Sequence, residues 1–133
     1  MQNDLQVLAA KEIAYASAAA LYGKQGIDIK MFNVTENTII ADYYVICSAR
    51  STTHIKALAD ETCYKLSLQG YEALRVEGKD GGTWVLVDFG SVIVHVFSKD
   101  AREFYNIERL QPENSEIDLT EFFEKEDEKN TKI

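Results

Sequence analysis

Valine or phenylalanine recurs at every second position on both sides of Gly90 in the stretch 84–97, WVLVDFGSVIVHVF. This alternation predicts two β-strands that face each other across a tight turn at Gly90-Ser91. Glycine at the first central position suits a two-residue turn that needs a positive φ there. With this register, six apolar residues share one face of the hairpin, which we expect to line the core: Val85, Val87, Phe89, Val92, Val94 and Val96.

The other face of the predicted hairpin is unusual for a solvent-exposed surface. It pairs Trp84, Leu86 and Asp88 of the first strand with residues 97, 95 and 93 of the second, which are Phe, His and Ile. A sheet face of this composition is either covered by the rest of the fold or used for binding. Because Trp, Phe and His occur together, we favour binding.

Periodicity and turn residues predict the remaining elements. Leu5, Leu8 and Ile13 recur at helical spacing in an Ala-rich segment, and Ser51 or Thr52 suits the N-cap of a second helix that ends near Gly70. In chain order, we expect a helix at 3–23, strands at 27–34 and 42–48, a helix from 51 to 70, a strand at 73–77, the two hairpin strands, and a short helix from Asp100 to about Asn106 with Asp100 as its cap.

The order α-β-β-α-β-β-β-α predicts an α/β fold with a single mixed sheet of about five strands. We expect a parallel, right-handed crossover from the strand at 42–48 through the second helix to the strand at 73–77. Both long helices should cover the valine-rich face. This leaves the Trp84 face without a long helix over it.

The C-terminal segment differs in composition from the rest of the chain. Residues 111–133 contain 8 acidic and 3 basic residues, which contribute −5 of the net charge of −8. We therefore divide the chain into a domain at 1–110 and an acidic extension at 111–133. A short amphipathic helix is expected at 117–123, and disorder from Glu124 onward.

Composition limits the classes of partner. A net charge of −8 disfavours direct contact with nucleic-acid phosphates and favours a basic protein as partner. No run of 18 apolar residues is present, so no membrane span is expected. The first 20 residues lack the pattern of a secretion signal, and Cys47 and Cys63 have no metal-ligand spacing, so a cytoplasmic location is expected.

Catalytic constellations are weak in this sequence. Cys47 or Ser48 could pair with His54, but no third orienting group is evident, and His54 is expected on the helix surface. Helix capping explains the hydroxyl-rich segment 51–53 without a phosphate site, because no Gly-rich loop precedes it. The aspartates are scattered and form no D-x-D pair. We expect no catalytic residues, no metal site and no cofactor.

Three ordered blocks of the sequence resemble one known family. RVEG at 75–78, the hairpin at 84–97 and REFYNIERL at 102–110 closely resemble the ribosomal silencing factor family, also called the Iojap family. The segment 42–61, DYYVICSARSTTHIKALADE, is similar to the family's upstream strand, turn and helix. The resemblance covers roughly residues 5–110. Gln111 departs from it, because members often have Trp after the ERL motif.

The resemblance implies a protein that is not an enzyme. Members have a topology like that of nucleotidyl transferases but lack the catalytic acids. They bind large-subunit ribosomal protein fourteen, block joining of the small subunit and repress translation when nutrients are limited. Related organellar proteins act in large-subunit assembly, which is the alternative role. Some members dimerise, so the resemblance allows a homodimer of the free protein.

The partner-binding surface is expected on the Trp84 face and in the REFYNIERL block. Within that block, Phe104, Ile107 and Leu110 suit the core, whereas Tyr105 and Glu108 lie at another angle. Asp88 and Glu108 are the acidic candidates for docking on a basic protein. The expected partner-binding residues are Trp84, Leu86, Asp88, His95, Phe97, Tyr105 and Glu108.

Overall fold

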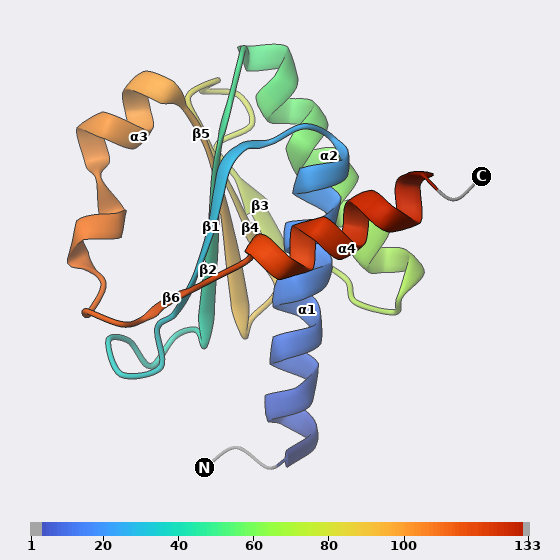
Figure 1. Cartoon of the computed structure of the whole chain (residues 1–133). Coiled ribbons are helices and arrows are strands. Elements are labelled where there is room, and N and C mark those ends of the chain that lie inside the picture. The colour runs from blue at the N-terminus through green and yellow to red at the C-terminus, as the bar shows by residue number, and fades with distance from the viewer. Residues whose placement is uncertain (1–3, 132–133) are drawn as a thin grey trace.

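The computed structural model describes residues 4–131, which form one mixed sheet with helices on both faces (Figure 1). The strand order is β3-β4-β5-β2-β1-β6. The elements are α1 (Asp4–Gly23), β1 (Ile27–Asn33), β2 (Tyr43–Ala49), α2 (Thr52–Leu68), β3 (Arg75–Glu77), β4 (Trp84–Asp88), β5 (Val92–Ser98), α3 (Lys99–Tyr105), the 3₁₀ helix η1 (Ile107–Leu110), β6 (Glu116–Ile117) and α4 (Thr120–Thr131). The α/β class and the single mixed sheet are as the sequence predicts.

The β4–β5 hairpin has the predicted register. Val85 pairs with Val96, and Val87 with Val94. Gly90 has φ +90°, a conformation that suits glycine, and the Phe89 N–H donates to the Val92 carbonyl at 2.9 Å. Two-residue alternation therefore placed the valines of both strands on one face correctly.

The prediction that β2 and β3 form a parallel crossover pair is wrong. β2 pairs in parallel with β5, from Tyr43–Val92 to Ala49–Ser98, and β3 lies at the sheet edge beside β4. The seven-residue β5 is buried along almost its whole length, so it can occupy the sheet centre next to β2. The three-residue β3 offers few pairing groups and takes the edge.

The main core lies between the valine-rich face and the helices α1 and α2, as predicted. Leu21 of α1 and Leu58 of α2 are fully buried against this face, together with Met31 of β1. All six valine-face residues belong to this core. Each fully buried aliphatic side chain contributes about 2 kcal/mol of hydrophobic stabilisation relative to exposure.

The opposite face is covered more than the sequence predicts. α3 and η1 lie over it (Figure 1), and a second core cluster there includes Ile46, Ile93 and Phe97. The two elements that cover this face are both short, which agrees with the expectation that no long helix lies over it. The Ser98 hydroxyl caps α3 by accepting from the Ala101 N–H at 3.1 Å. Asp100, the predicted cap, lies in the first turn instead.

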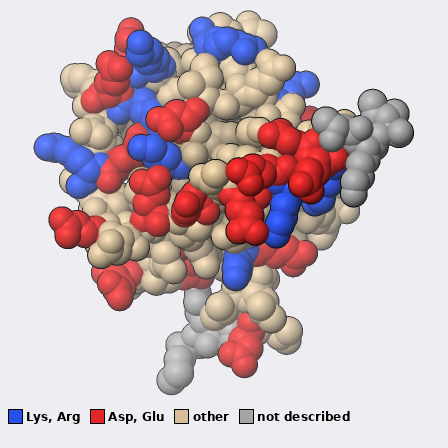
Figure 2. All heavy atoms as spheres, in the orientation of Figure 1, with Lys and Arg blue, Asp and Glu red and all other residues tan. Residues whose placement is uncertain are grey.

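The C-terminal segment is folded onto the domain, in contrast to the predicted disorder from Glu124. β6 pairs with β1 and adds a sixth strand to the expected five. α4 continues to Thr131, and its acidic side chains gather on the surface (Figure 2). The Phe123 ring stacks on Tyr22 with centroids 4.3 Å apart. These aromatic contacts stabilise a segment whose charge alone suggests disorder; residues 132–133 of the predicted disordered end lie outside the described residues.

Hydrogen bonds fix the start of α2, and a glycine conformation is required just after β3. The Ser51 hydroxyl accepts from the His54 N–H at 3.1 Å, so the predicted N-cap is confirmed. The His54 ring is buried, contrary to the expected surface position, because it joins two loops: its Nδ1 accepts from the Arg50 N–H at 3.0 Å and its Nε2 lies 2.9 Å from the Lys24 carbonyl. Gly78 has φ +91°, and a Cβ there would overlap the Trp84 carbonyl.

Candidate protein-binding surface

Trp84 begins β4 and lies at the boundary between the second core cluster and solvent. Its indole N–H donates to His95 Nδ1 at 3.2 Å, and its ring lies 4.8 Å from the ring of Phe97. Leu86, two residues along the strand, is also half-buried on this face. Trp84 is therefore fixed by the fold and half-buried.

His95 and Phe97 lie beneath this surface, where the chain itself covers them. Phe97 is fully buried, and His95 is buried against the rings of Tyr44 and Trp84. Burial lowers the pKa of His95 from 6.5 to about 4, so the ring is neutral at physiological pH. This corrects the expectation that both residues lie on an open face: they lie beneath Trp84 and support it, and their predicted role in partner binding stays a prediction.

Exposed aromatic residues of α3 extend the surface beyond the hairpin. The ring of Tyr105 lies 4.8 Å from that of Trp84, and the ring of Phe104 lies 5.0 Å from that of Tyr105. Phe104 is 80% exposed, although the sequence suggested a core position for it. We call Trp84, Leu86, Phe104 and Tyr105 the aromatic surface. Exposed aromatic rings that adjoin half-buried apolar side chains are typical of a protein-binding site.

The core predicted in the REFYNIERL block is only partly present. Ile107 is half-buried against the second core cluster, whereas Leu110 is 62% exposed. The inward-facing residues of α3 are Ala101 and Arg102. A helix of seven residues makes fewer than two turns, so its apolar period carries too little signal to identify the buried side.

The Asp88 carboxylate is bound by two groups within the chain. Its Oδ1 accepts from the Gly90 N–H at 2.7 Å, and its Oδ2 pairs with Arg75 Nε at 3.1 Å. Its side chain is only 15% exposed. Asp88 therefore stabilises the turn after β4, and its charge is already balanced by Arg75. Its predicted role in partner binding stays a prediction.

Glu108 is likewise engaged, by two basic residues. Its Oε1 accepts from Arg102 Nε at 2.6 Å, and its Oε2 lies 3.5 Å from Lys30 Nζ. Burial acts to raise the pKa of Glu108, but the hydrogen bonds and ion pairs with Arg102 and Lys30 outweigh burial and lower the pKa below its ordinary value. Glu108 ties η1 to α3 and β1, so its partner-binding role also stays a prediction.

The structure does not support the catalytic pair that the sequence suggested, because neither the Cys47 thiol nor the His54 ring is available to react. Burial raises the pKa of Cys47 to about 12, which suppresses the reactive thiolate, although nearby Arg102 acts in the opposite direction. Both ring nitrogens of His54 contact backbone groups. Within residues 4–131, no three His, Cys, Asp or Glu side chains are placed to hold a metal ion, and no helix there is long and apolar enough to cross a membrane.

These features define a small mixed α/β domain that presents an exposed aromatic surface beside a buried aromatic support. The chain belongs to the ribosomal silencing factor family, because the family described as "Ribosomal silencing factor during starvation" matches residues 7–133. The resemblance seen in the three sequence blocks is therefore confirmed. The match also extends past residue 110, into β6 and α4.

Individual relatives agree with this assignment. The ribosomal silencing factor RsfS of Bacillus subtilis is 39% identical over 100 residues, which is 75% of this chain and 85% of that protein. A crystal structure of a protein from Chromobacterium violaceum matches with a TM-score of 0.74 and 34% identity, covering 76% of this chain and 84% of that one. The mouse "Mitochondrial assembly of ribosomal large subunit protein 1" is 36% identical over 86 residues, 62% of this chain and 38% of that protein.

Proposed function

We propose that this protein docks through its aromatic surface on large-subunit ribosomal protein fourteen and sterically blocks joining of the small subunit. In this way it would repress translation when nutrients are limited, without catalysis. Membership of the silencing factor family over residues 7–133 is the observation that carries the proposal. The aromatic surface supplies a docking site that needs no chemistry at the interface.

The contacts around Trp84 support a preorganised surface. Trp84 is held by one hydrogen bond and by the rings of Phe97 and Tyr105, so little side-chain entropy remains to be lost on binding. Phe104 stands 80% exposed beside this rigid base. Aromatic anchors of this kind often contribute about 2 kcal/mol or more to binding when they become buried in a partner.

The acidic character of the protein supports docking on a basic partner at long range. The net charge of −8 attracts a basic ribosomal protein before contact and speeds association. Asp88 and Glu108 are each paired within the chain, so they contribute less to short-range contacts than to this overall field. We therefore expect moderate salt to slow association more than it speeds dissociation.

The experiment that tests this function uses purified large and small subunits under ionic conditions that favour their joining. The protein is added to large subunits first, and the fraction of joined ribosomes is measured by light scattering and sucrose-gradient sedimentation. We expect the protein to co-sediment with large subunits and to reduce joining in proportion to its occupancy. Full joining on saturated large subunits would contradict the proposal.

A second candidate is a large-subunit assembly factor that uses the same docking surface. The 36% identity to the mouse mitochondrial assembly protein over 86 residues favours it. The same sedimentation experiment separates the two roles. Binding to mature large subunits with loss of joining supports silencing, whereas preferential binding to immature large-subunit particles, without an effect on joining, supports assembly.

A further inference from the structure

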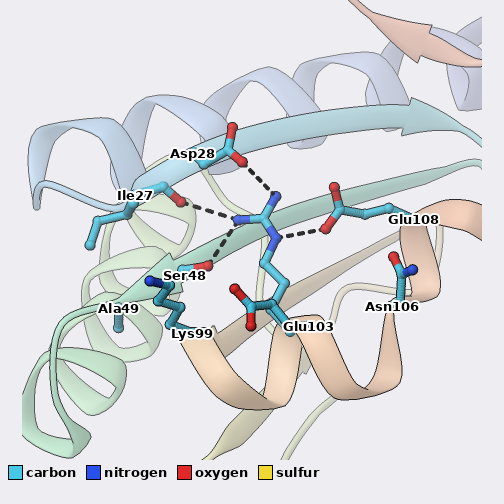
Figure 3. Close-up of a pocket in the computed structure, with 9 residues that line it drawn as sticks. Ile27, Asp28, Ser48, Ala49, Lys99, Glu103, Asn106 and Glu108 are labelled. Atoms are coloured by element: carbon cyan, nitrogen blue, oxygen red, sulfur yellow. Dashed lines mark hydrogen bonds and ion pairs between the residues drawn. The ribbon is translucent and has the colours of Figure 1, made fainter.

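A cleft on the face of the sheet that carries α3 has a polar floor that the docking function does not use. It encloses about 460 Å³ and lies where the parallel strands β2 and β5 end (Figure 3). Its lining includes Ile27, Asp28, Lys99, Arg102 and Glu103. Crevices at the carboxyl ends of parallel strands commonly bind small molecules, and this volume is in the usual range of about 300–1,000 Å³.

Arg102 forms the floor of the cleft, and one of its donors lacks a hydrogen bond. Its side chain is 9% exposed, its Nε donates to Glu108, and its Nη1 donates to the Ser48 hydroxyl at 3.0 Å and to the Ile27 carbonyl at 3.3 Å. Among the described residues, its Nη2 has no hydrogen-bond partner; it is ion-paired with Asp28 Oδ2 at 3.6 Å, a distance longer than that of a good hydrogen bond. A buried donor without an acceptor is costly, so this nitrogen favours a ligand with an acceptor group.

Charges of both signs surround this nitrogen. Figure 3 shows Asp28 on β1 and, across the cleft, Lys99 and Glu103 on α3. With Glu108, three carboxylates and two basic groups line the cleft, so a phosphate-rich ligand would be repelled. A ligand with adjacent negative and positive groups fits this alternation better than a simple anion or cation does.

We propose that this cleft binds a free α-amino acid. The carboxylate of the amino acid takes the place of Asp28 beside Arg102 Nη2 and accepts from this nitrogen, and its ammonium group lies by the displaced carboxylate of Asp28. Ile27, which is 42% exposed, and Ala49 give the cleft an apolar wall suited to an aliphatic side chain. The inference does not rest on the proposed ribosomal role, because binding can be measured without ribosomes.

The test is calorimetric titration of the full chain with L-leucine, with leucinamide (which lacks the carboxylate) and with N-acetyl-leucine (which lacks the ammonium group). The key variant is Asp28→Asn, since Asn tolerates the φ of +49° at this position and the side chain is 63% exposed. Asp60→Asn on α2 is the matched control, because Asp60 is also 63% exposed and also contacts one basic side chain.

We expect saturable binding of L-leucine, and binding at least about tenfold weaker for both analogues and for Asp28→Asn, with the Asp60→Asn protein unchanged. Absence of saturable leucine binding at millimolar concentration would overturn the proposal, and it would mean that Asp28 itself closes onto Arg102. Equal leucine affinities of the Asp28→Asn and Asp60→Asn proteins would also overturn it. Binding of inorganic phosphate in place of leucine would identify an anion site and refute the zwitterion.

Discussion

His95 makes the domain sensitive to mild acid. Trp84 can only donate to the ring, so His95 Nδ1 is the acceptor and the proton of the neutral ring lies on Nε2. This Nε2 has no hydrogen-bond partner among the described residues, and the ring is 5% exposed. Protonation would therefore place an unpaired charge in the second core cluster and break the acceptor site used by Trp84.

The size of the effect follows from the pKa of His95. Burial lowers this pKa from 6.5 in the unfolded chain to about 4 in the folded protein. Each pKa unit corresponds to about 1.36 kcal/mol, so the shift costs about 3 kcal/mol of unfolding free energy in acid. The unfolded chain gains its proton first. Stability is therefore intact above pH 6.5, falls as the pH drops from 6.5 to 4, and loses nothing more from this group below that.

The assay is urea unfolding of the parent and of His95→Asn at several pH values from about 7 to about 4. The Asn side-chain oxygen can accept from Trp84 but does not titrate. The variant loses some packing at every pH, so the pH slope and not the offset is compared. Carboxylates titrate equally in both proteins and cancel in the difference. We expect the parent to lose about 3 kcal/mol more than the variant over this range.

Parallel stability curves for the two proteins would refute this reasoning. They would mean that the folded protein accommodates the imidazolium ion, through water or a local opening of α3. In that case His95 would not be a sealed support for Trp84, and the rigidity assigned to the aromatic surface would lose its physical basis.

Three further predictions follow from burial and contacts. Burial raises the pKa of Cys47 to about 12, so iodoacetamide should label the half-buried Cys63 first, and mass spectrometry showing equal rates in the folded protein would contradict this. Arg102→Gln leaves the Glu108 carboxylate without its main partner and should lower the unfolding free energy by about 3 kcal/mol in urea titrations. An unchanged urea midpoint would show that the Arg102–Glu108 pair is dispensable. A chain ending at Lys125 should melt within a few degrees of the parent, whereas one ending at Pro112 loses the apolar anchors of α4 and should lose several kcal/mol; equal melting of both truncations would refute the packing of α4.

The hairpin shows what the sequence could predict. Its register follows from a side-chain period of two and from a turn that glycine permits, and both are local properties. The family could also be inferred, because three ordered blocks at fixed spacing form a specific pattern. The helices α1 and α2 were predictable for the same reason: each is long enough to show its apolar period, and Ser51 marks the start of α2.

The cover of the Trp84 face could not be predicted, because it depends on tertiary packing. α3 has seven residues, too few to show which side is buried, so the sequence suggests a core position for Phe104, which is 80% exposed. The burial of Arg102 depends on Glu108, six residues further on, and on acceptors from the distant strands β1 and β2. Similarly, α4 has the charge of a disordered tail, and it is held by contacts with α1, about a hundred residues away in sequence, such as the stacking of Phe123 on Tyr22.

The most direct test of the central claim is the affinity of the Phe104→Ala protein for isolated large subunits, compared with that of Tyr64→Ala. Phe104 lies on the aromatic surface, whereas Tyr64 is a 57% exposed residue of α2 on the other side of the sheet. Both side chains are exposed, so each change should alter stability by less than about 1 kcal/mol. We predict that Phe104→Ala weakens binding by about 2 kcal/mol, roughly thirtyfold in Kd, and that Tyr64→Ala binds like the parent. Parental affinity of a folded Phe104→Ala protein would contradict docking through this surface.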